Sequence, residues 1–305
     1  MPRSLAMHIL EALASHHGRE AGPSVTRNFD LSDFDSVELT VPFDVEIRVG
    51  EPAGLEARGD EHAIEALRIE QDGPRLRLSC KRIGDVDLVL SAPTLRALTM
   101  NGSGDVALDG VDGDSFELAS RGSGEFEADG IRAATVTIGG FGSGDVAVNA
   151  INAAALKVTL SGSGDFSADA VNAASFALAL EGSGDAGIDA LSGDRAEVAL
   201  HGSGDLAIDD IHGEQLAVSV FGSGDVGVGG GTVKSGRLEI AGSGDIAAEQ
   251  TRFETVAIAI HGSGSAALCV TERAEVDLNG SGDAVLTGGA KCSIRRNGSG
   301  EARCS

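Results

Sequence analysis

A carboxylate stands at the same place in a motif that recurs along most of the chain. The motif is Gly-Ser-Gly followed by an acidic residue, and successive copies at steps of twenty residues carry Asp105, Glu125, Asp145, Asp165, Asp185, Asp205, Asp225 and Asp245. Carboxylate oxygens are ligands that Ca²⁺ prefers in proteins. The six aspartates from Asp145 to Asp245 are therefore candidate calcium ligands, and the sequence indicates no other cofactor.

The same carboxylates have a structural interpretation, which we favour. If the copies stack at a strand spacing of about 4.8 Å, neighbouring carboxylates repel by roughly 1 kcal/mol in water and by about 3–4 kcal/mol at an effective dielectric near 20. Backbone N–H groups and serine hydroxyls at the turn can offset this repulsion, as they do in an Asx turn. Calcium binding is the alternative to this role.

Catalytic chemistry has little support in the sequence. His201 and His261 each precede a Gly-Ser-Gly, but they are three repeats apart and cannot share a metal ion. No single repeat carries a localised acid, base or nucleophile, which a polysaccharide-cleaving enzyme needs. Only Phe141 and Phe221 are aromatic residues expected to point outward, where a sugar could stack. We predict a protein that is not an enzyme and has no catalytic residues.

The spacing of the motif predicts the elements that hold these residues. Gly-Ser-Gly begins at Gly102 and recurs eight times at steps of twenty residues and then twice at steps of eighteen. Each repeat has two short runs of alternating apolar residues, such as Val146/Val148 and Leu156/Val158/Leu160. Period-two alternation is typical of strands with one buried face, and a fixed period of this length is typical of stacked repeats. The predicted fold is all-β, a right-handed parallel β-helix (solenoid) with about 20 residues per coil.

The glycines of the motif are predicted to make the turn. Glycine permits positive φ and close approach of backbones, which a sharp corner shared by all coils requires. The predicted turn positions are Gly102, Gly104, Gly142, Gly144, Gly162, Gly164, Gly182, Gly184, Gly202, Gly204, Gly222, Gly224, Gly242 and Gly244.

Three regions are expected along the chain. Residues 1–27 are predicted to form an amphipathic helix or a disordered leader, and residues 28–100 to form β-rich opening coils and a cap. A short helix is expected within this second region, near Asp60 to Leu67. Residues 101–305 are predicted to form the regular β-helix.

Charge and cysteine content narrow the range of partners. The net charge of −24 argues against binding to nucleic acid, and no segment is long and apolar enough to be a transmembrane span. Cys292 and Cys304 are expected to point inward in the last two coils, where they form either a disulfide or two buried thiols. Stacking of exposed coil ends, or a cross-link through Cys304, would give a homo-oligomer.

Two features together resemble a known bacterial family. The phrase Phe34-Asp35-Ser36-Val37 followed by Pro42-Phe43-Asp44-Val45-Glu46-Ile47, together with the Gly-Ser-Gly-Asp repeats, resembles the putative auto-transporter adhesin, head GIN domain family, a domain of unknown function. The resemblance implies a β-helix in the bacterial cell envelope with an adhesin role and no catalytic residues.

The expected function is therefore that of a non-enzymatic surface scaffold, whose ligand is an unidentified protein or glycan. A calcium-binding repeat protein and a self-assembling structural protein are the alternatives, and a polysaccharide-active enzyme ranks last. The chain has no clear signal peptide, so a cytoplasmic location is the alternative to the cell envelope.

Overall fold

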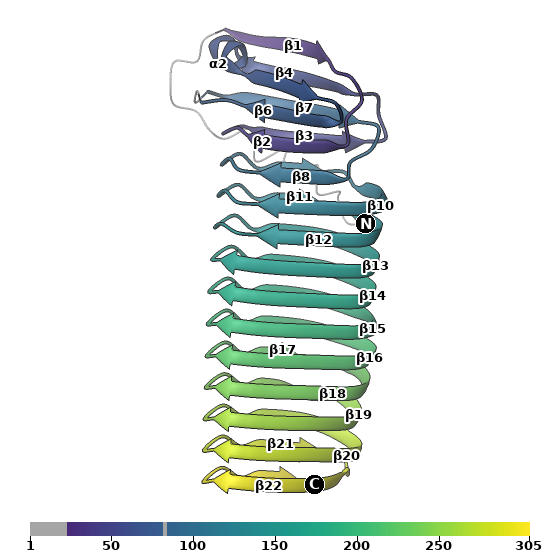
Figure 1. Ribbon diagram of the computed structural model, residues 1–305, viewed down its shortest axis with the longest axis vertical. Coiled ribbons are helices and arrows are strands. Elements are labelled where there is room, and N and C mark those ends of the chain that lie inside the picture. The colour runs from purple at the N-terminus through teal and green to yellow at the C-terminus, as the bar shows by residue number, and fades with distance from the viewer. Residues whose placement is uncertain (1–22, 82–83) are drawn as a thin grey trace.

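The computed structural model describes residues 23–81 and 84–305, and these form one long stack of β-strands (Figure 1). Strand β1 begins at Ser24, four residues before the predicted boundary at residue 28. The remainder of the predicted leader, up to residue 22, lies outside the described residues. In the described part of the chain no helix has the length and hydropathy needed to cross a membrane.

The N-terminal end of the stack combines antiparallel and parallel strands around one short helix. Strand β4 pairs antiparallel with β1 and β7, and β5 pairs antiparallel with β6. Helix α2 (Glu61–Ala66) confirms the predicted short helix. Asp60 caps its N-terminus by accepting a hydrogen bond from the Ala63 N–H at 2.9 Å. The strands of this part are β1 (Ser24–Asp30), β2 (Ser36–Thr40), β3 (Asp44–Val49), β4 (Gly54–Asp60), β5 (Arg68–Asp72), β6 (Arg75–Ser79), β7 (Val86–Ala92) and β8 (Ala97–Met100).

The remaining strands pair in parallel with their equivalents in the coils above and below. Partners differ by twenty residues along most of the stack, as in Val146 with Phe166, and by eighteen near its end, as in Ala266 with Ala284. These strands are β9 (Val106–Leu108), β10 (Val111–Ser120), β11 (Phe126–Ala128), β12 (Ile131–Gly140), β13 (Val146–Gly162), β14 (Phe166–Gly182), β15 (Ala186–Gly202), β16 (Leu206–Gly222), β17 (Val226–Val228), β18 (Gly231–Gly242), β19 (Ile246–Gly262), β20 (Ala266–Gly280), β21 (Ala284–Thr287), β22 (Lys291–Gly298) and β23 (Ala302–Cys304).

The predicted fold class is confirmed. In Figure 1 the chain runs right to left along the near side, returns along the far side, and descends by one coil in each circuit, which is a right-handed path. The structure is a parallel β-solenoid, and the coils repeat about every twenty residues.

The bend inside each coil differs from the prediction of two separate strands. In β13 to β16 a single strand of 17 residues continues through the bend. The strand is interrupted where glycine lies at the bend, at Gly110, Gly130, Gly230, and Gly288 and Gly289, whereas it continues through Ala150 and Ala170. Glycine weakens a strand because it loses more conformational entropy on ordering.

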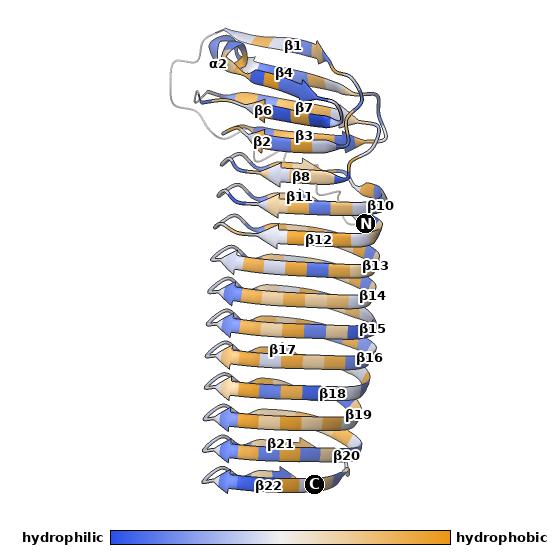
Figure 2. Cartoon of the chain, viewed as in Figure 1, coloured by the Kyte–Doolittle hydropathy of each residue, from blue (hydrophilic) through white to orange (hydrophobic). Residues whose placement is uncertain are grey.

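The core consists of columns of equivalent buried residues that run along the stack axis. The alternating apolar residues of each coil point inward, and Figure 2 shows this alternation along the near strands. Large residues lie beside small ones in neighbouring coils: Phe166 pairs with Ala186, and Phe176 pairs with Ala196. Each large side chain fills the space that its small neighbour leaves, so the interior stays packed although the repeats are not identical.

Candidate binding surfaces

The Gly-Ser-Gly corner is held together by close backbone contact between coils. The Ser183 N–H donates to the Gly162 carbonyl at 3.1 Å, and the same bond recurs in the next coil from Ser203 to Gly182 at 3.0 Å. A Cβ atom added to Gly202 or Gly204 would overlap the carbonyl oxygen of the equivalent glycine one coil earlier. Close approach therefore explains both glycines of the motif. Positive φ is found only at the first glycine and only from Gly182 onward, as at Gly202 (φ +144°), so the first coils do not require it.

The aspartate of the motif forms a ladder of hydrogen bonds along the stack. One carboxylate oxygen of Asp145 accepts the backbone N–H of Asp165 at 2.8 Å, and Asp165 accepts that of Asp185 in the same way. The donor is a backbone N–H at each step, and among the described residues no serine hydroxyl donates to these carboxylates. Equivalent bonds of 2.7–2.8 Å follow at Asp205, Asp225, Asp245 and Ser265.

This geometry supports the structural interpretation of the carboxylates. A hydrogen bond to an ionised acceptor is stronger than a neutral one, so each donated N–H offsets part of the repulsion along the column. The described residues include no group of three Asp, Glu, His or Cys side chains close enough to hold a metal ion. The arrangement gives no support to the calcium alternative.

The ladder is interrupted at Glu125. Its own N–H donates to Asp105 at 2.8 Å, but its longer side chain does not accept the N–H of Asp145 within the described structure. Burial raises the pKa of the Glu125 carboxyl, and repulsion from Glu127 and Asp105 raises it further. Burial likewise raises the pKa of Glu127, which has one buried carboxylate oxygen that lacks a hydrogen-bond partner among the described residues. In this coil, hydrogen bonds therefore offset less of the repulsion between carboxylates than the aspartate ladder does in the later coils.

Replacing Glu125 by aspartate is expected to stabilise the protein. The shorter carboxylate would reach the Asp145 N–H and close the ladder, which should raise the free energy of unfolding by about 1 kcal/mol. Urea denaturation of the wild type and of Glu125→Asp measures this difference. Glu181→Asp is the matched control, because Glu181 is exposed, lies outside the ladder, and should give no gain when it is shortened. A Glu125→Asp variant no more stable than the control would contradict the structural role of the aspartates.

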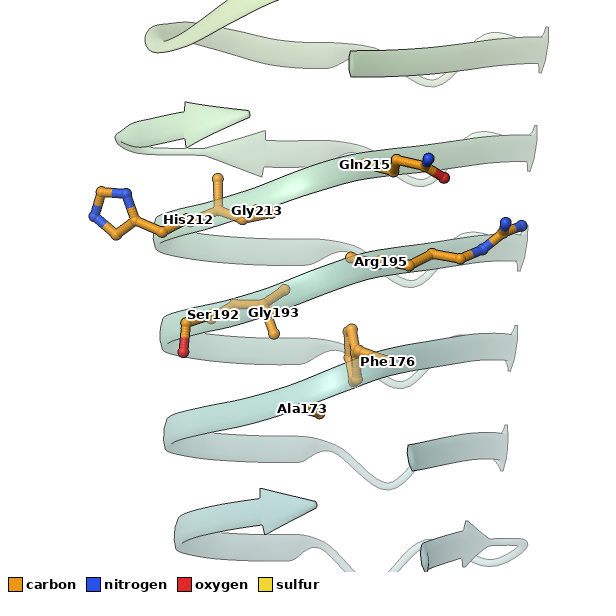
Figure 3. Close-up of a pocket in the computed structure, with 11 residues that line it drawn as sticks. Ala173, Phe176, Ser192, Gly193, Arg195, His212, Gly213 and Gln215 are labelled. Carbon is orange, nitrogen blue, oxygen red and sulfur yellow. The ribbon is translucent and has the colours of Figure 1, made fainter. Parts of the chain in front are cut away.

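Among the hollows on the described surface, two lie on different parts of the stack. The first is lined by residues of β14, β15 and β16 near the bend, where His212 and Ser192 point outward and Phe176 points into the coil (Figure 3). Its volume is about 10 Å³, which is near the minimum for a single water molecule. This hollow is too small for a ligand.

The second hollow has a volume of about 340 Å³ and lies over β2, β6, β8 and β10, on the outer side of the sheet. Its floor consists of small side chains, and charged side chains surround it. The residues around it are Ser36, Val37, Glu38, Arg75, Ala97, Thr99, Asn101, Glu117 and Arg121. Sequence analysis missed this hollow, because β6 belongs to an irregular hairpin and its pairing beside β2 is not part of the repeat.

The two outward phenylalanines lie in one row beside the Gly-Ser-Gly corner, as predicted. Phe141 is 47% exposed and Phe221 is 39% exposed. The Arg121 guanidinium lies 5.7 Å from the centre of the Phe141 ring, and the His201 ring stacks on Phe221 with centroids 4.9 Å apart. His201 and His261 are both exposed. The ring partner of His201 is Phe221, which is not a metal ligand.

The last two coils carry a disulfide bond. Cys292 and Cys304 are bonded, with their Cα atoms 6.6 Å apart, which agrees with the disulfide interpretation of these residues. In the register of the stack Cys292 lies over Ala274 and Cys304 over Leu286, both buried inward-facing residues, as expected. Cys304 is nevertheless exposed, because β23 has a neighbouring coil on one side only. Of the other two cysteines, Cys80 is buried and Cys269 is half-buried.

The fold and the surface together define a class of protein: a right-handed β-solenoid with a small N-terminal cap, an acidic hydrogen-bonded corner and outward rows of repeated side chains. Within this class the chain belongs to the family described as "Putative auto-transporter adhesin, head GIN domain", whose model matches residues 33–192 and 177–290. The resemblance inferred from the sequence motifs is thus confirmed.

Several solved structures are similar to this chain. An adhesin described as putative from Bacteroides fragilis is 15% identical, with a TM-score of 0.36, and the match covers 93% of this chain and 97% of that one. One from Parabacteroides merdae is 15% identical, with a TM-score of 0.40 and the same coverage. A protein from Parabacteroides distasonis titled a putative lipid binding protein is 20% identical, with a TM-score of 0.36 and the same coverage. No curated protein matches the sequence.

Proposed function

We propose that the protein is a non-enzymatic binding scaffold of the bacterial cell envelope, with an adhesin-like role. The observation that carries this proposal is the combination of family membership with a stack that repeats the same outer surface coil after coil. The eleven Gly-Ser-Gly corners, stacked at a strand spacing of about 4.8 Å, give a rod on the order of 50 Å long. Such a rod holds side chains in straight rows and at a distance from its point of attachment.

The internal bonding of the rod supports this role. Backbone hydrogen bonds connect each coil to the next at the corner, and the aspartate ladder adds a second line of bonds beside them. A protein held in this way loses little conformational entropy when a ligand binds, so contacts on its outer rows contribute more fully to affinity. The outer rows of the stack are thus the surface on which we place ligand binding.

Cell fractionation with surface labelling tests the proposal in the bacterium that encodes the protein. An antibody against the solenoid should label intact cells, and the protein should be found in the envelope fraction. Cells lacking the protein should adhere less to immobilised host glycoproteins or to neighbouring cells, and expression of the full chain should restore adhesion. Retention of the protein in the cytosolic fraction, or unchanged adhesion of the deletion strain, would contradict the proposal.

A further inference from the structure

We infer that the 340 Å³ hollow on the cap side of the stack, together with the ring of Phe141, binds an oligosaccharide that carries a carboxylate. This inference rests on the proposed binding function and assigns that function a site and a class of ligand. Its basis is the way in which small, charged and aromatic side chains are placed on four adjacent strands and the coil that follows them.

The hollow exists because small residues meet in register on the outer face. Arg75 on β6 lies beside Ser36 on β2, Ser36 lies beside Ala97 on β8, and Ala97 lies beside Glu117 on β10. The two short side chains in the middle leave space between the two long charged ones. Four adjacent strands span about 14 Å, so the hollow is long enough for more than one sugar ring.

The surrounding side chains are suited to sugar hydroxyls and to a carboxylate. Glu117 is a hydrogen-bond acceptor. Glu38 already accepts from Arg77 and from the Asn101 amide, the latter at 3.4 Å, and the carbonyl oxygen of Asn101 is a further acceptor. Arg75 and Arg121 lie toward opposite ends and, within the described part of the chain, neither has a carboxylate partner, whereas Arg77 nearby is paired with Glu38 at 2.9 Å. An unpaired guanidinium presents a planar set of donors that fits a carboxylate in bidentate geometry.

Phe141 extends the site by one coil. A Cβ atom added to Gly139 would lie 2.5 Å from Cε2 and 2.8 Å from Cζ of Phe141, so the phenyl ring occupies the space that a side chain at that position would fill. The Phe141 side chain is still 47% exposed. The face of an aromatic ring attracts the partly positive C–H groups of a pyranose, so an exposed ring held beside the hollow can stack on a sugar.

Arg121 links the Phe141 ring to the hollow. Its guanidinium lies 5.7 Å from the centre of the Phe141 ring, and the same side chain lines the hollow. A sugar stacked on Phe141 would therefore place the neighbouring sugar of the same chain over the hollow, with its carboxylate within reach of Arg121.

A peptide fits the site less well than a sugar. Extended peptides usually bind to a sheet by adding a strand at a free edge. Strands β2, β8 and β10 each have a strand on both sides, so their main-chain groups are already paired. A highly charged polyanion is disfavoured by the net charge of −24. A mostly neutral glycan with an occasional carboxylate avoids both difficulties.

The test measures binding of the purified full chain to immobilised oligosaccharides that contain glucuronate, galacturonate or sialic acid, each beside its carboxyl-reduced form. At least one acidic oligosaccharide should bind, and its reduced form should bind about tenfold more weakly. Phe141→Ala and Arg121→Gln should each weaken binding by about tenfold or more. Arg121→Lys should also weaken it, because lysine keeps the charge but not the planar set of donors.

Matched controls come from the same surface. Phe221→Ala removes the other exposed phenylalanine of the row, and Arg237→Gln removes an exposed arginine of β18 that has no ion-pair partner in the described structure. Both should bind as the wild type does. Circular dichroism and thermal unfolding show whether each variant keeps the fold.

Three results would overturn the inference: equal binding of the reduced sugars, equal losses in the control variants, or binding of peptides alone. The outcome also separates this inference from the proposed function. A protein that mediates cell adhesion but ignores every sugar of the panel would disprove the glycan site and leave the adhesive role intact. A protein that supports neither adhesion nor sugar binding would disprove both.

Discussion

Gly202→Ala is expected to destabilise the solenoid by about 3 kcal/mol or more. The added Cβ would overlap the carbonyl oxygen of Gly182 in the coil above, and φ at this position is +144°, a conformation that side-chain-bearing residues rarely adopt. Overpacking and backbone strain each cost about 1–3 kcal/mol, and both act here. The coils would have to separate at this corner, and the hydrogen bonds from Ser203 and Asp205 would be lost with them.

Gly187→Ala provides the matched control within the same coil. A Cβ added at Gly187 meets no atom within 4 Å, and φ there is not positive. This control should be neutral or slightly stabilising, because alanine restricts the unfolded chain more than glycine does. Urea denaturation gives the two stabilities, and hydrogen exchange should show the loss in the Gly202→Ala variant concentrated in β15 and its two neighbouring strands. Similar stabilities of the two variants would show that the corner does not depend on close approach.

The solenoid, its register and its inward-facing residues could be predicted from the sequence because all three depend on the period. Because Gly-Ser-Gly recurs every twenty residues, it fixes which residues stack, and parallel pairing such as Val146 with Phe166 follows directly. Alternation within a coil then determines which side chains are inward. The same reasoning placed the acidic residues in a column, and elementary electrostatics required that column to receive hydrogen-bond donors.

Two features could not be predicted because they depend on departures from the repeat. Whether a strand continues through the bend varies with the residue there, glycine at 130 and alanine at 150, although the period places both residues at the same position of the coil. The hollow depends on β6, which enters the sheet from an antiparallel hairpin outside the repeat. One local signal was present: Gly139 interrupts a position that threonine, alanine or serine occupies in the next coils, and the ring of Phe141 lies on it.

The packing of large beside small residues in the core leads to the second large effect. Phe166→Ala is expected to lower the free energy of unfolding by about 3–5 kcal/mol, because Phe166 is 1% exposed and its coil neighbours cannot collapse into the space without breaking register. The exposed Phe141→Ala is the control of equal size and should change stability by no more than about 0.5 kcal/mol. Urea denaturation compares the two variants.

A double variant shows whether the stability lost in Phe166→Ala depends on the neighbouring core residue of the next coil. Ala186 is the direct neighbour of Phe166 in the next coil and is 4% exposed, so Ala186→Phe alone should overpack the core. Combined with Phe166→Ala, the new ring can occupy the space that the old one left, and the double variant should recover part of the stability lost by Phe166→Ala. Such coupling between residues twenty positions apart is expected only if they lie directly over one another. Strictly additive losses would show that the two side chains do not share one space in the core.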